Sequence, residues 1–124
     1  MNKRVIGDGN EDLVCNYLKS QGLKIIARNF RCRQGEIDII ARDKEYLCFI
    51  EVKFRNSSDY GQPQEAVNYY KQRKISKVSR FYLYSKNLSF DTPIRYDVIA
   101  VSVNEGIKAV KWIKNAFDYA GRGF

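Results

Sequence analysis

Hydrophobic and polar positions alternate along the chain in patterns that predict two helices and five strands. Leu13, Val14, Tyr17 and Leu18 recur at the spacing of one helix face, and Gly22 follows them as a natural stop. Other stretches are rich in isoleucine, valine and aromatic residues, as strands are. In chain order we expect a helix over 9–21, strands over 23–30, 36–41 and 46–53, a helix over 64–86, and strands over 94–103 and 107–113.

This order of elements predicts an α/β fold with a mixed central β-sheet flanked by helices. The run Leu47-Cys48-Phe49-Ile50 is apolar on both faces, which indicates a central strand. The chain has 124 residues and no repeat, low-complexity tract or linker, so we expect one domain over 1–124. Because no apolar run reaches the length of a signal peptide or a membrane span, we expect a cytoplasmic protein without membrane contact.

Two carboxylates and a lysine fall on the predicted hairpin of strands 36–41 and 46–53, whose turn covers 42–45. With a turn of two or four residues, Asp38 and Glu51 point to the same face of the sheet. With a two-residue turn at Lys44-Glu45 they are directly opposite, with β-carbons about 5 Å apart, and Lys53 shares their face. An odd-length loop without a bulge would turn Asp38 away.

Facing carboxylates repel each other unless positive charge lies between them, and a divalent cation supplies that charge. Mg²⁺, with Mn²⁺ as the alternative, accepts one or two carboxylates and keeps several waters, which leaves positions for a phosphate and an attacking water. We expect Asp38 and Glu51, with the carbonyl of Val52, to hold the metal. Lys53 would orient the water or stabilise the transition state. The chain has no histidine, so imidazole is excluded as base, nucleophile or ligand.

The formal charge of +8 is unevenly distributed. No acid lies between Glu65 and Asp91, where six basic residues fall, and a second basic group precedes the carboxylate motif. Such clusters suit a phosphate backbone, although a basic surface also keeps a small protein soluble. The predicted nucleic-acid contacts are Arg31, Arg33, Arg55, Lys71, Arg73, Lys74 and Lys77.

The three cysteines, Cys15, Cys32 and Cys48, cannot all pair, and they form no Cys-x-x-Cys arrangement. Without histidine they are a poor zinc site. We expect small, buried, reduced thiols.

Matching motifs, in order and at comparable spacing, extend over nearly the whole chain. They are Gly7-x-x-x-Glu11-Asp12-Leu13 with Tyr17-Leu18, Ala27-Arg28-Asn29-Phe30-Arg31-Cys32-Arg33, Gly35-Glu36-Ile37-Asp38-Ile39-Ile40-Ala41, Phe49-Ile50-Glu51-Val52-Lys53-x-Arg55, Gly61-x-Pro63-x-Glu65-Ala66-Val67, Lys71-Gln72, Arg95-Tyr96-Asp97-Val98 and Ala116-Phe117. On these motifs the chain resembles the YraN-like family of small bacterial proteins. That family is similar to archaeal Holliday-junction resolvases of the PD-(D/E)xK nuclease superfamily.

The resemblance implies a restriction-endonuclease-like core, with a metal bound by Asp38 and Glu51 and a water assisted by Lys53. It also implies that Glu11, on the first helix, completes the site, and that Gln72 contacts metal-bound water or substrate.

Several of these residues have ordinary alternatives. Glu11 could stabilise the first turn of its helix through the helix dipole, and Gln72 could be a polar surface residue. Glu36 could support the site or only solvate the end of its strand. For Asp97 we favour a structural ion pair, with Arg95 as one candidate partner. The tyrosines would mostly fill gaps in the core and at interfaces, with a few able to stack on unpaired bases.

The leading hypothesis is a Mg²⁺-dependent endonuclease that hydrolyses phosphodiester bonds in branched or structured DNA. If Holliday junctions are the substrate, a two-fold homodimer is implied, because two strands must be cut symmetrically. One alternative is a catalytically silent nucleic-acid-binding or recruitment module on the same fold, although clustered carboxylates facing phosphates would hinder a pure binder. Another is a protein-interaction domain whose basic face binds an acidic partner.

Overall fold

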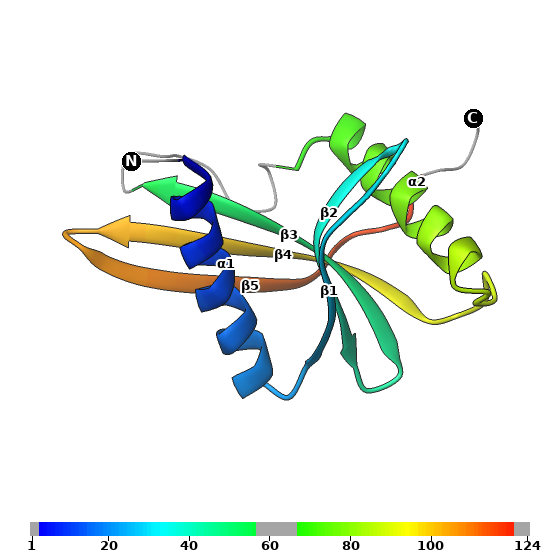
Figure 1. Cartoon of the computed structure of the whole chain (residues 1–124), viewed down its shortest axis with the longest axis horizontal. Helices are drawn as coiled ribbons and strands as arrows, with labels where there is room; N and C mark the ends of the chain where they lie inside the picture. Colours follow the sequence, from blue (N-terminus) through cyan, green and yellow to red (C-terminus); the bar gives the residue numbers. More distant parts are fainter. Residues whose placement is uncertain (1–2, 57–66, 121–124) are drawn as a thin grey trace.

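The computed structural model describes residues 3–56 and 67–120, arranged as two helices and five strands (Figure 1). The order helix, three strands, helix, two strands is the predicted one. In chain order the elements are α1 (Lys3–Ser20), β1 (Lys24–Cys32), β2 (Gly35–Asp43), β3 (Tyr46–Asn56), α2 (Tyr69–Ser85), β4 (Ile94–Asn104) and β5 (Ile107–Phe117).

The strands form one sheet in the order β1-β2-β3-β4-β5, which confirms the predicted mixed α/β architecture. The first three strands make an antiparallel meander. The connection that contains α2 then crosses over, so β4 pairs parallel to β3, and β5 returns antiparallel to β4. As predicted, β3 is central, with a hydrogen-bonded neighbour on each side.

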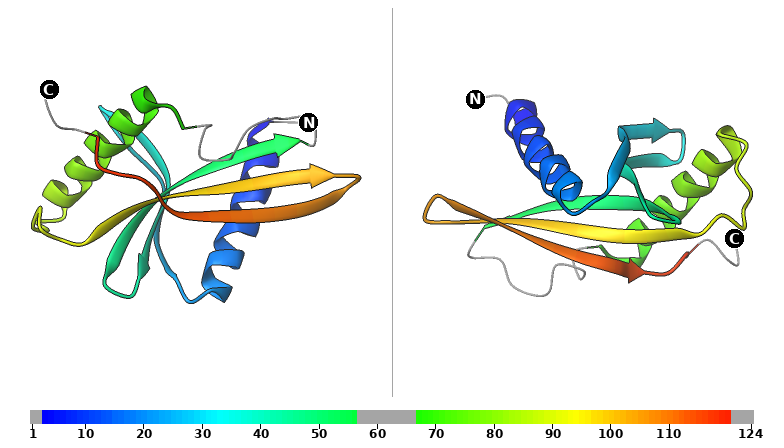
Figure 2. Two further views of the ribbon diagram at one scale, coloured as in Figure 1. Left: turned by 180° about the vertical axis from the view of Figure 1, so that it is seen from behind. Right: turned by 90° about the horizontal axis from the view of Figure 1, so that it is seen from below.

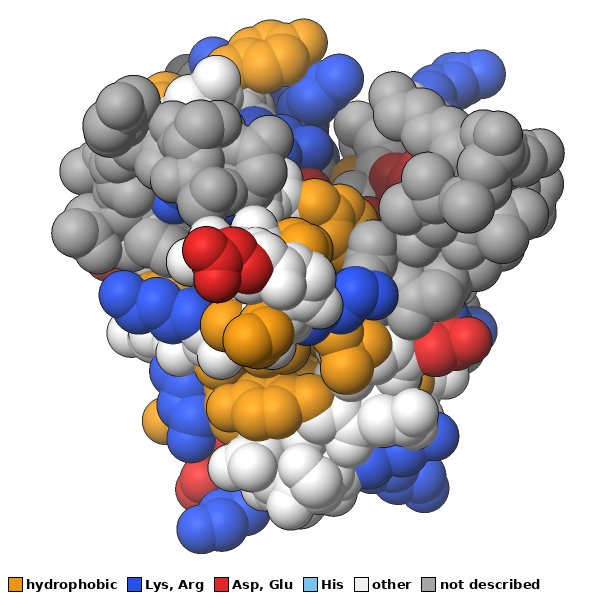
Figure 3. Space-filling view, turned by 90° about the vertical axis from the view of Figure 1, so that its left-hand side faces the viewer, with side chains coloured by type: hydrophobic (Ala, Val, Ile, Leu, Met, Phe, Trp, Pro, Cys, Tyr) orange, Lys and Arg blue, Asp and Glu red, His pale blue; other side chains and the backbone are white. Residues whose placement is uncertain are grey.

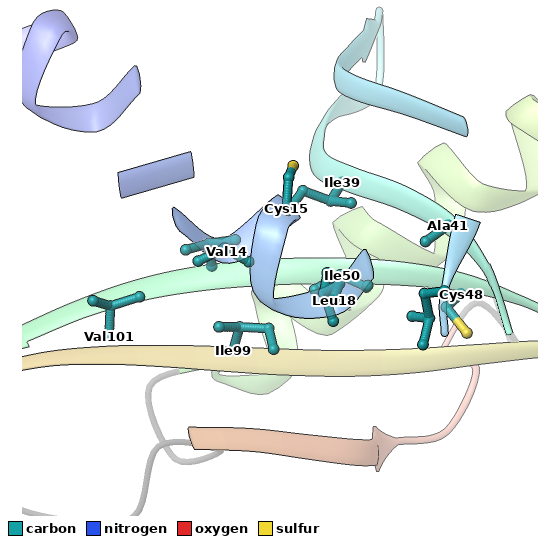
Figure 4. Close-up of a cluster of buried hydrophobic side chains, with 11 residues drawn as sticks. Val14, Cys15, Leu18, Ile39, Ala41, Cys48, Ile50, Ile99 and Val101 are labelled. Carbon is teal, nitrogen blue, oxygen red and sulfur yellow. The ribbon is translucent and has the colours of Figure 1, made fainter. Parts of the chain in front are cut away.

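The two helices cover opposite faces of the sheet. Alternate residues of β3 accordingly belong to two different hydrophobic clusters. Cys48 and Ile50 pack with Val14 and Leu18 of α1, a cluster seen in Figure 4. Phe49 and its neighbours on the other face pack instead under α2, whose buried residues include Ile75, Val78, Tyr82 and Leu83. The end of α2 that follows Asn68 lies beside the tip of the β1–β2 hairpin (Figure 1).

Both helices begin at different residues from those predicted. α1 begins at Lys3, because Gly7 and Gly9 are accommodated inside the helix, where a glycine costs about 1 kcal/mol relative to alanine without ending the helix. α2 begins at Tyr69 rather than residue 64, because Asn68 adopts an extended conformation and its side chain accepts the backbone N–H of Lys71. Residues 64–66 lie outside the described part of the chain.

Asp97 has no exposed surface and forms the ion pair predicted for it. Its carboxylate accepts hydrogen bonds from Arg95, from the indole N–H of Trp112 at 3.0 Å and from the backbone N–H of Asn115 at 2.9 Å. Arg95 also bonds Asp43 of β2 at 2.9 Å. The network therefore connects three strands of the sheet.

The three cysteines are free, as predicted. Cys15 and Cys48 are buried, and burial raises the pKa of the Cys48 thiol to about 12. Cys32 differs from the prediction because it is only half-buried, at the end of β1.

Figure 3 looks onto the end of the molecule where the β4–β5 hairpin turns, and hydrophobic side chains gather there among basic ones. Phe54, Val103 and Ile107 are exposed at this end of the sheet. None of the helices in the described residues is both long enough and apolar enough to cross a membrane.

Candidate functional site

The site is built on the β2–β3 hairpin. Its ladder runs from Asp43↔Tyr46 to Ile39↔Ile50, so the turn is the two-residue one at Lys44-Glu45, one of the two lengths that place Asp38 and Glu51 on the same face. Beyond Ile39, the carboxylate of Asp38 replaces a backbone acceptor: its Oδ2 accepts the backbone N–H of Val52 at 2.8 Å. This hydrogen bond holds the Asp38 side chain against the segment of β3 that carries Glu51.

Asp38 and Glu51 both line a cleft of about 540 Å³ between the β1–β2 hairpin and the first turns of α2. The Figure 1 view shows these two elements side by side at the end of α2 that follows Asn68. The other lining residues are Arg31, Cys32, Gly35, Glu36, Lys71, Lys74 and Ile75. The cleft thus combines three carboxylates with three cationic side chains.

Glu51 lies between two lysines. Its side chain is only 8% exposed, and a carboxylate buried to this extent needs a compensating charge. Lys71 supplies the closer one, with Nζ 3.0 Å from Oε1, and Lys53 approaches the same oxygen at 3.9 Å. Lys71, from α2, is therefore the principal partner of a carboxylate on β3.

Asp38 is the least compensated member of the site. Burial and the nearby charge of Glu51 raise its pKa to about 7, although the bond from Val52 and the charge of Lys71 act in the opposite direction. Burial, together with the neighbouring Lys71, lowers the pKa of Lys53. Burial alone would also lower the pKa of Lys71, but Glu51 outweighs it and the net shift is upward.

This donor set fits a hard divalent cation. Two carboxylates that repel each other at the mouth of a cleft provide oxygen ligands and negative charge, and Mg²⁺ accepts one or two carboxylates and otherwise keeps water. Among the side chains that the structure describes, no three Asp, Glu or Cys residues converge as a ligand set. Asp38 and Glu51 are a pair of carboxylates in the cleft that could hold a metal.

The structure does not bring Glu11 into the cleft. Its Oε2 accepts the side-chain amide of Asn29 at 3.1 Å and lies 3.4 Å from Arg28 Nη2, so its carboxylate is held by β1. Arg28 also bonds Asp12 at 2.8 Å. Glu11 here joins α1 to β1, and its predicted part in the site remains a prediction.

The side chain of Gln72 also makes a contact within the protein: its amide donates a hydrogen bond to the backbone carbonyl of Val67 at 2.9 Å. Its neighbour Lys71 reaches Glu51 instead. The sequence identified Lys71 only as a nucleic-acid contact, since no local pattern shows which side chain of a helix will meet a carboxylate 20 positions earlier on a strand.

The predicted nucleic-acid contacts divide into three groups. Arg31, Lys71 and Lys74 line the cleft, and Arg31 pairs with Glu36 at 3.0 Å. Arg73 and Lys77 lie farther along, in a smaller hollow beside α2. Arg33 and Arg55 line neither.

These features define a small α/β protein in which a five-stranded mixed sheet and the helix α2 bring two carboxylates and two lysines close together. Residues 10–101 match the model of a family described as "Uncharacterised protein family UPF0102", and the chain belongs to this family. The predicted membership of the YraN-like family is thereby confirmed.

Similar proteins cover almost the whole chain. A UPF0102 protein of Lachnoclostridium phytofermentans is 46% identical over 121 residues, which is 98% of this chain and 99% of the relative. One from Clostridium kluyveri is 46% identical over 114 residues, covering 90% and 93%. One from Geobacter metallireducens is 42% identical over 120 residues, covering 97% and 98%. The sequence similarity thus extends over nearly the full length of these relatives.

Proposed function

We propose that this protein is a Mg²⁺-dependent endonuclease that hydrolyses phosphodiester bonds in branched or structured DNA. One observation carries the proposal: Asp38 and Glu51 line a single cleft, and two lysines approach the same oxygen of Glu51. The resemblance to Holliday-junction resolvases on the motifs around these residues supports the choice of substrate. We further propose that the protein acts in the cytoplasm.

The metal would be held by Asp38 and Glu51. When bound, it supplies a water of lowered pKa and positive charge for the phosphate. The protein contributes position and charge: the Val52 N–H fixes Asp38, and Lys71 fixes Glu51. Lys53, whose pKa is lowered by burial, is suited to orient a water or to stabilise charge that develops on the phosphate.

Basic side chains at the cleft would bind the DNA backbone on either side of the reacting bond. Arg31 and Lys74 line opposite walls, one on the β1–β2 hairpin and one on α2, so a strand lying in the cleft could contact both through its phosphates. A four-way junction has two-fold symmetry, so cutting it symmetrically would require two copies of the chain.

The test is cleavage of labelled four-way junction, flap and single-stranded DNA with Mg²⁺ or Mn²⁺. We expect metal-dependent cutting that falls at least about a hundredfold in Asp38→Asn and Lys53→Ala, while DNA binding persists. Asp91→Asn and Lys111→Ala change exposed residues outside the cleft and serve as matched controls that retain activity. Cutting that survives in Asp38→Asn would refute the proposed site.

A second candidate function is a nucleic-acid-binding module that does not cut. It is favoured by the contacts of Glu51, which two lysines already neutralise, and by the contacts that hold Glu11 on β1. Tight DNA binding without cutting under either metal would establish this function instead.

A further inference from the structure

The outer face of α2 carries both aromatic and basic side chains. Tyr70, Lys74, Lys77, Phe81 and Tyr84 follow one another at spacings of three and four residues, which places them on one stripe of the helix. The opposite face of the helix is the buried one. Tyr70 and Tyr84 are 66% and 72% exposed, an unusual position for large rings that a core could have used.

This stripe borders two hollows that continue from the candidate site. The first, of about 190 Å³, shares Lys74 with the main cleft and also contains Tyr70. The second, of about 560 Å³, shares Gln34 and Lys77 with the first and extends past the far end of α2. The residues of this aromatic–basic track are Gln34, Tyr70, Arg73, Lys74, Lys77, Arg80, Phe81, Tyr84, Phe90 and Tyr119.

Within the track, cations already lie over rings. Lys74 Nζ is 5.2 Å from the centre of the Tyr70 ring, and the Arg80 guanidinium is 4.6 Å from that of Phe90. No acidic residue in the described part of the chain lines either hollow, and the sequence of α2 contains none. The track therefore presents ring faces within a field of positive charge.

That chemistry matches an unpaired polynucleotide. Phosphates satisfy the cations, and exposed base faces stack on aromatic rings, whereas in a duplex the faces are already stacked on each other. Two copies of the chain would not pair through this face, because a two-fold interface would bring the same cations together. From Tyr70 to Tyr84 the helix rises about 21 Å, enough for roughly six nucleotides at 3.4 Å each.

We infer that the aromatic–basic track binds an unpaired DNA strand that leaves the cleft along the outer side of α2. The choice of DNA, and of the cleft as the strand's origin, rests on the proposed function. Figure 1 shows α2 along one side of the molecule, where a strand could follow it without crossing the sheet.

The experiment measures binding of labelled oligo(dT) of about 12 nucleotides by fluorescence anisotropy in EDTA, so that no cleavage intervenes. We expect oligo(dT) to bind more tightly than a duplex of equal length. Tyr84→Ala and Phe90→Ala should each weaken binding at least about fivefold, while Tyr84→Phe keeps it. Tyr69→Ala is the matched control with unchanged binding, because Tyr69 is an exposed tyrosine of the same helix that lies outside the track. Thermal unfolding of each variant verifies that it is folded.

Three results would overturn the inference: equal affinity for the duplex, binding of oligo(U) but not oligo(dT), or binding of polyglutamate as tight as that of oligo(dT). Its failure is distinguishable from failure of the nuclease proposal. Track-dependent binding without any cutting keeps the inference and rejects the nuclease. Asp38-dependent cutting with full oligo(dT) binding in the Tyr84→Ala and Phe90→Ala variants does the reverse.

Discussion

At the scale of single residues, the two carboxylates of the site differ in how much nearby positive charge compensates them. Glu51 has Lys71 at 3.0 Å, whereas Asp38 has the Val52 N–H at 2.8 Å and no ion pair with a described residue within 4.0 Å. A backbone N–H stabilises a carboxylate but adds no net positive charge. Asp38 is therefore the position where ionisation is most unfavourable in the metal-free protein.

The first prediction concerns stability and pH in EDTA. The pKa of Asp38 is about 7 in the folded protein, compared with its ordinary value of 3.8 in the unfolded chain. The folded state therefore binds the proton of this carboxyl group more tightly. The free energy of unfolding consequently decreases as the pH rises from about 4 to about 7, and above that range this group changes it no further. Asp38→Asn is neutral throughout. Its stability relative to wild type should rise by roughly 2 to 4 kcal/mol between about pH 4 and pH 8, measured by urea denaturation.

Asp91→Asn is the control for this measurement, because Asp91 is exposed and lies outside the cleft. A stability difference between wild type and Asp38→Asn that is independent of pH would show that Asp38 ionises normally in the folded protein.

The second prediction separates the two lysines. Removing Lys71 leaves Glu51 buried without its nearest cation, whereas Lys53 lies 3.9 Å away and contributes less. Because Lys71 is itself partly exposed, we expect Lys71→Met to cost only about 2 kcal/mol of unfolding free energy, and Lys53→Met less than 1 kcal/mol. Glu51→Gln should remove most of the Lys71→Met penalty in a double-mutant cycle. A larger penalty for Lys53→Met than for Lys71→Met would reverse this assignment.

At the scale of elements, the hairpin and the shared face of its two carboxylates could be predicted from the sequence, but the length of the turn could not. A two-residue turn fixes the register by arithmetic, and alternation along each strand then fixes the faces. The positions of Glu11 and Gln72 could not be predicted in this way. Each lies on or next to a helix, and its partner depends on how that helix packs on the sheet.

The start of α2 illustrates the same limit. The sequence favours a helix from residue 64, but the helix begins at Tyr69, because the side chain of Asn68 accepts the Lys71 N–H and caps the helix there. That start orients the first turn so that Lys71 points to Glu51. The cap therefore contributes to the site as well as to the helix.

The third prediction tests this cap. Asn68→Ala removes the acceptor for the Lys71 N–H and should cost about 1 kcal/mol, whereas Asn68→Asp should be nearly neutral because it keeps an acceptor. In hydrogen exchange, the first turn of α2 should lose protection in Asn68→Ala while β3 and β4 keep theirs. Unchanged protection in the first turn would mean that packing under α2, and not the cap, fixes its start.

At the scale of the whole molecule, the sheet separates two hydrophobic clusters of different composition. α1 covers one face with a largely aliphatic cluster, and α2 covers the other with a cluster rich in aromatic rings. The candidate cleft lies at the side where α2 meets the β1–β2 hairpin. The Asp97 network lies outside this cleft and connects β2, β4 and β5.

The last prediction concerns that network. Asp97 is fully buried, and its removal would leave the Trp112 indole N–H and the Asn115 backbone N–H without their acceptor. The Arg95 guanidinium would keep Asp43 as its remaining partner. Buried donors that lose a charged acceptor carry large penalties, so Asp97→Ala should cost about 4 kcal/mol and lower the melting temperature by roughly 15 °C. Asp97→Leu combined with Arg95→Met should recover part of that loss, since the charge and its partner leave together. At a temperature where Asp97→Ala is still folded, the DNA binding that we propose should equal that of wild type, because Asp97 is not in the cleft. If the folded variant instead binds DNA more weakly than wild type, loss of the network must change the structure of the cleft.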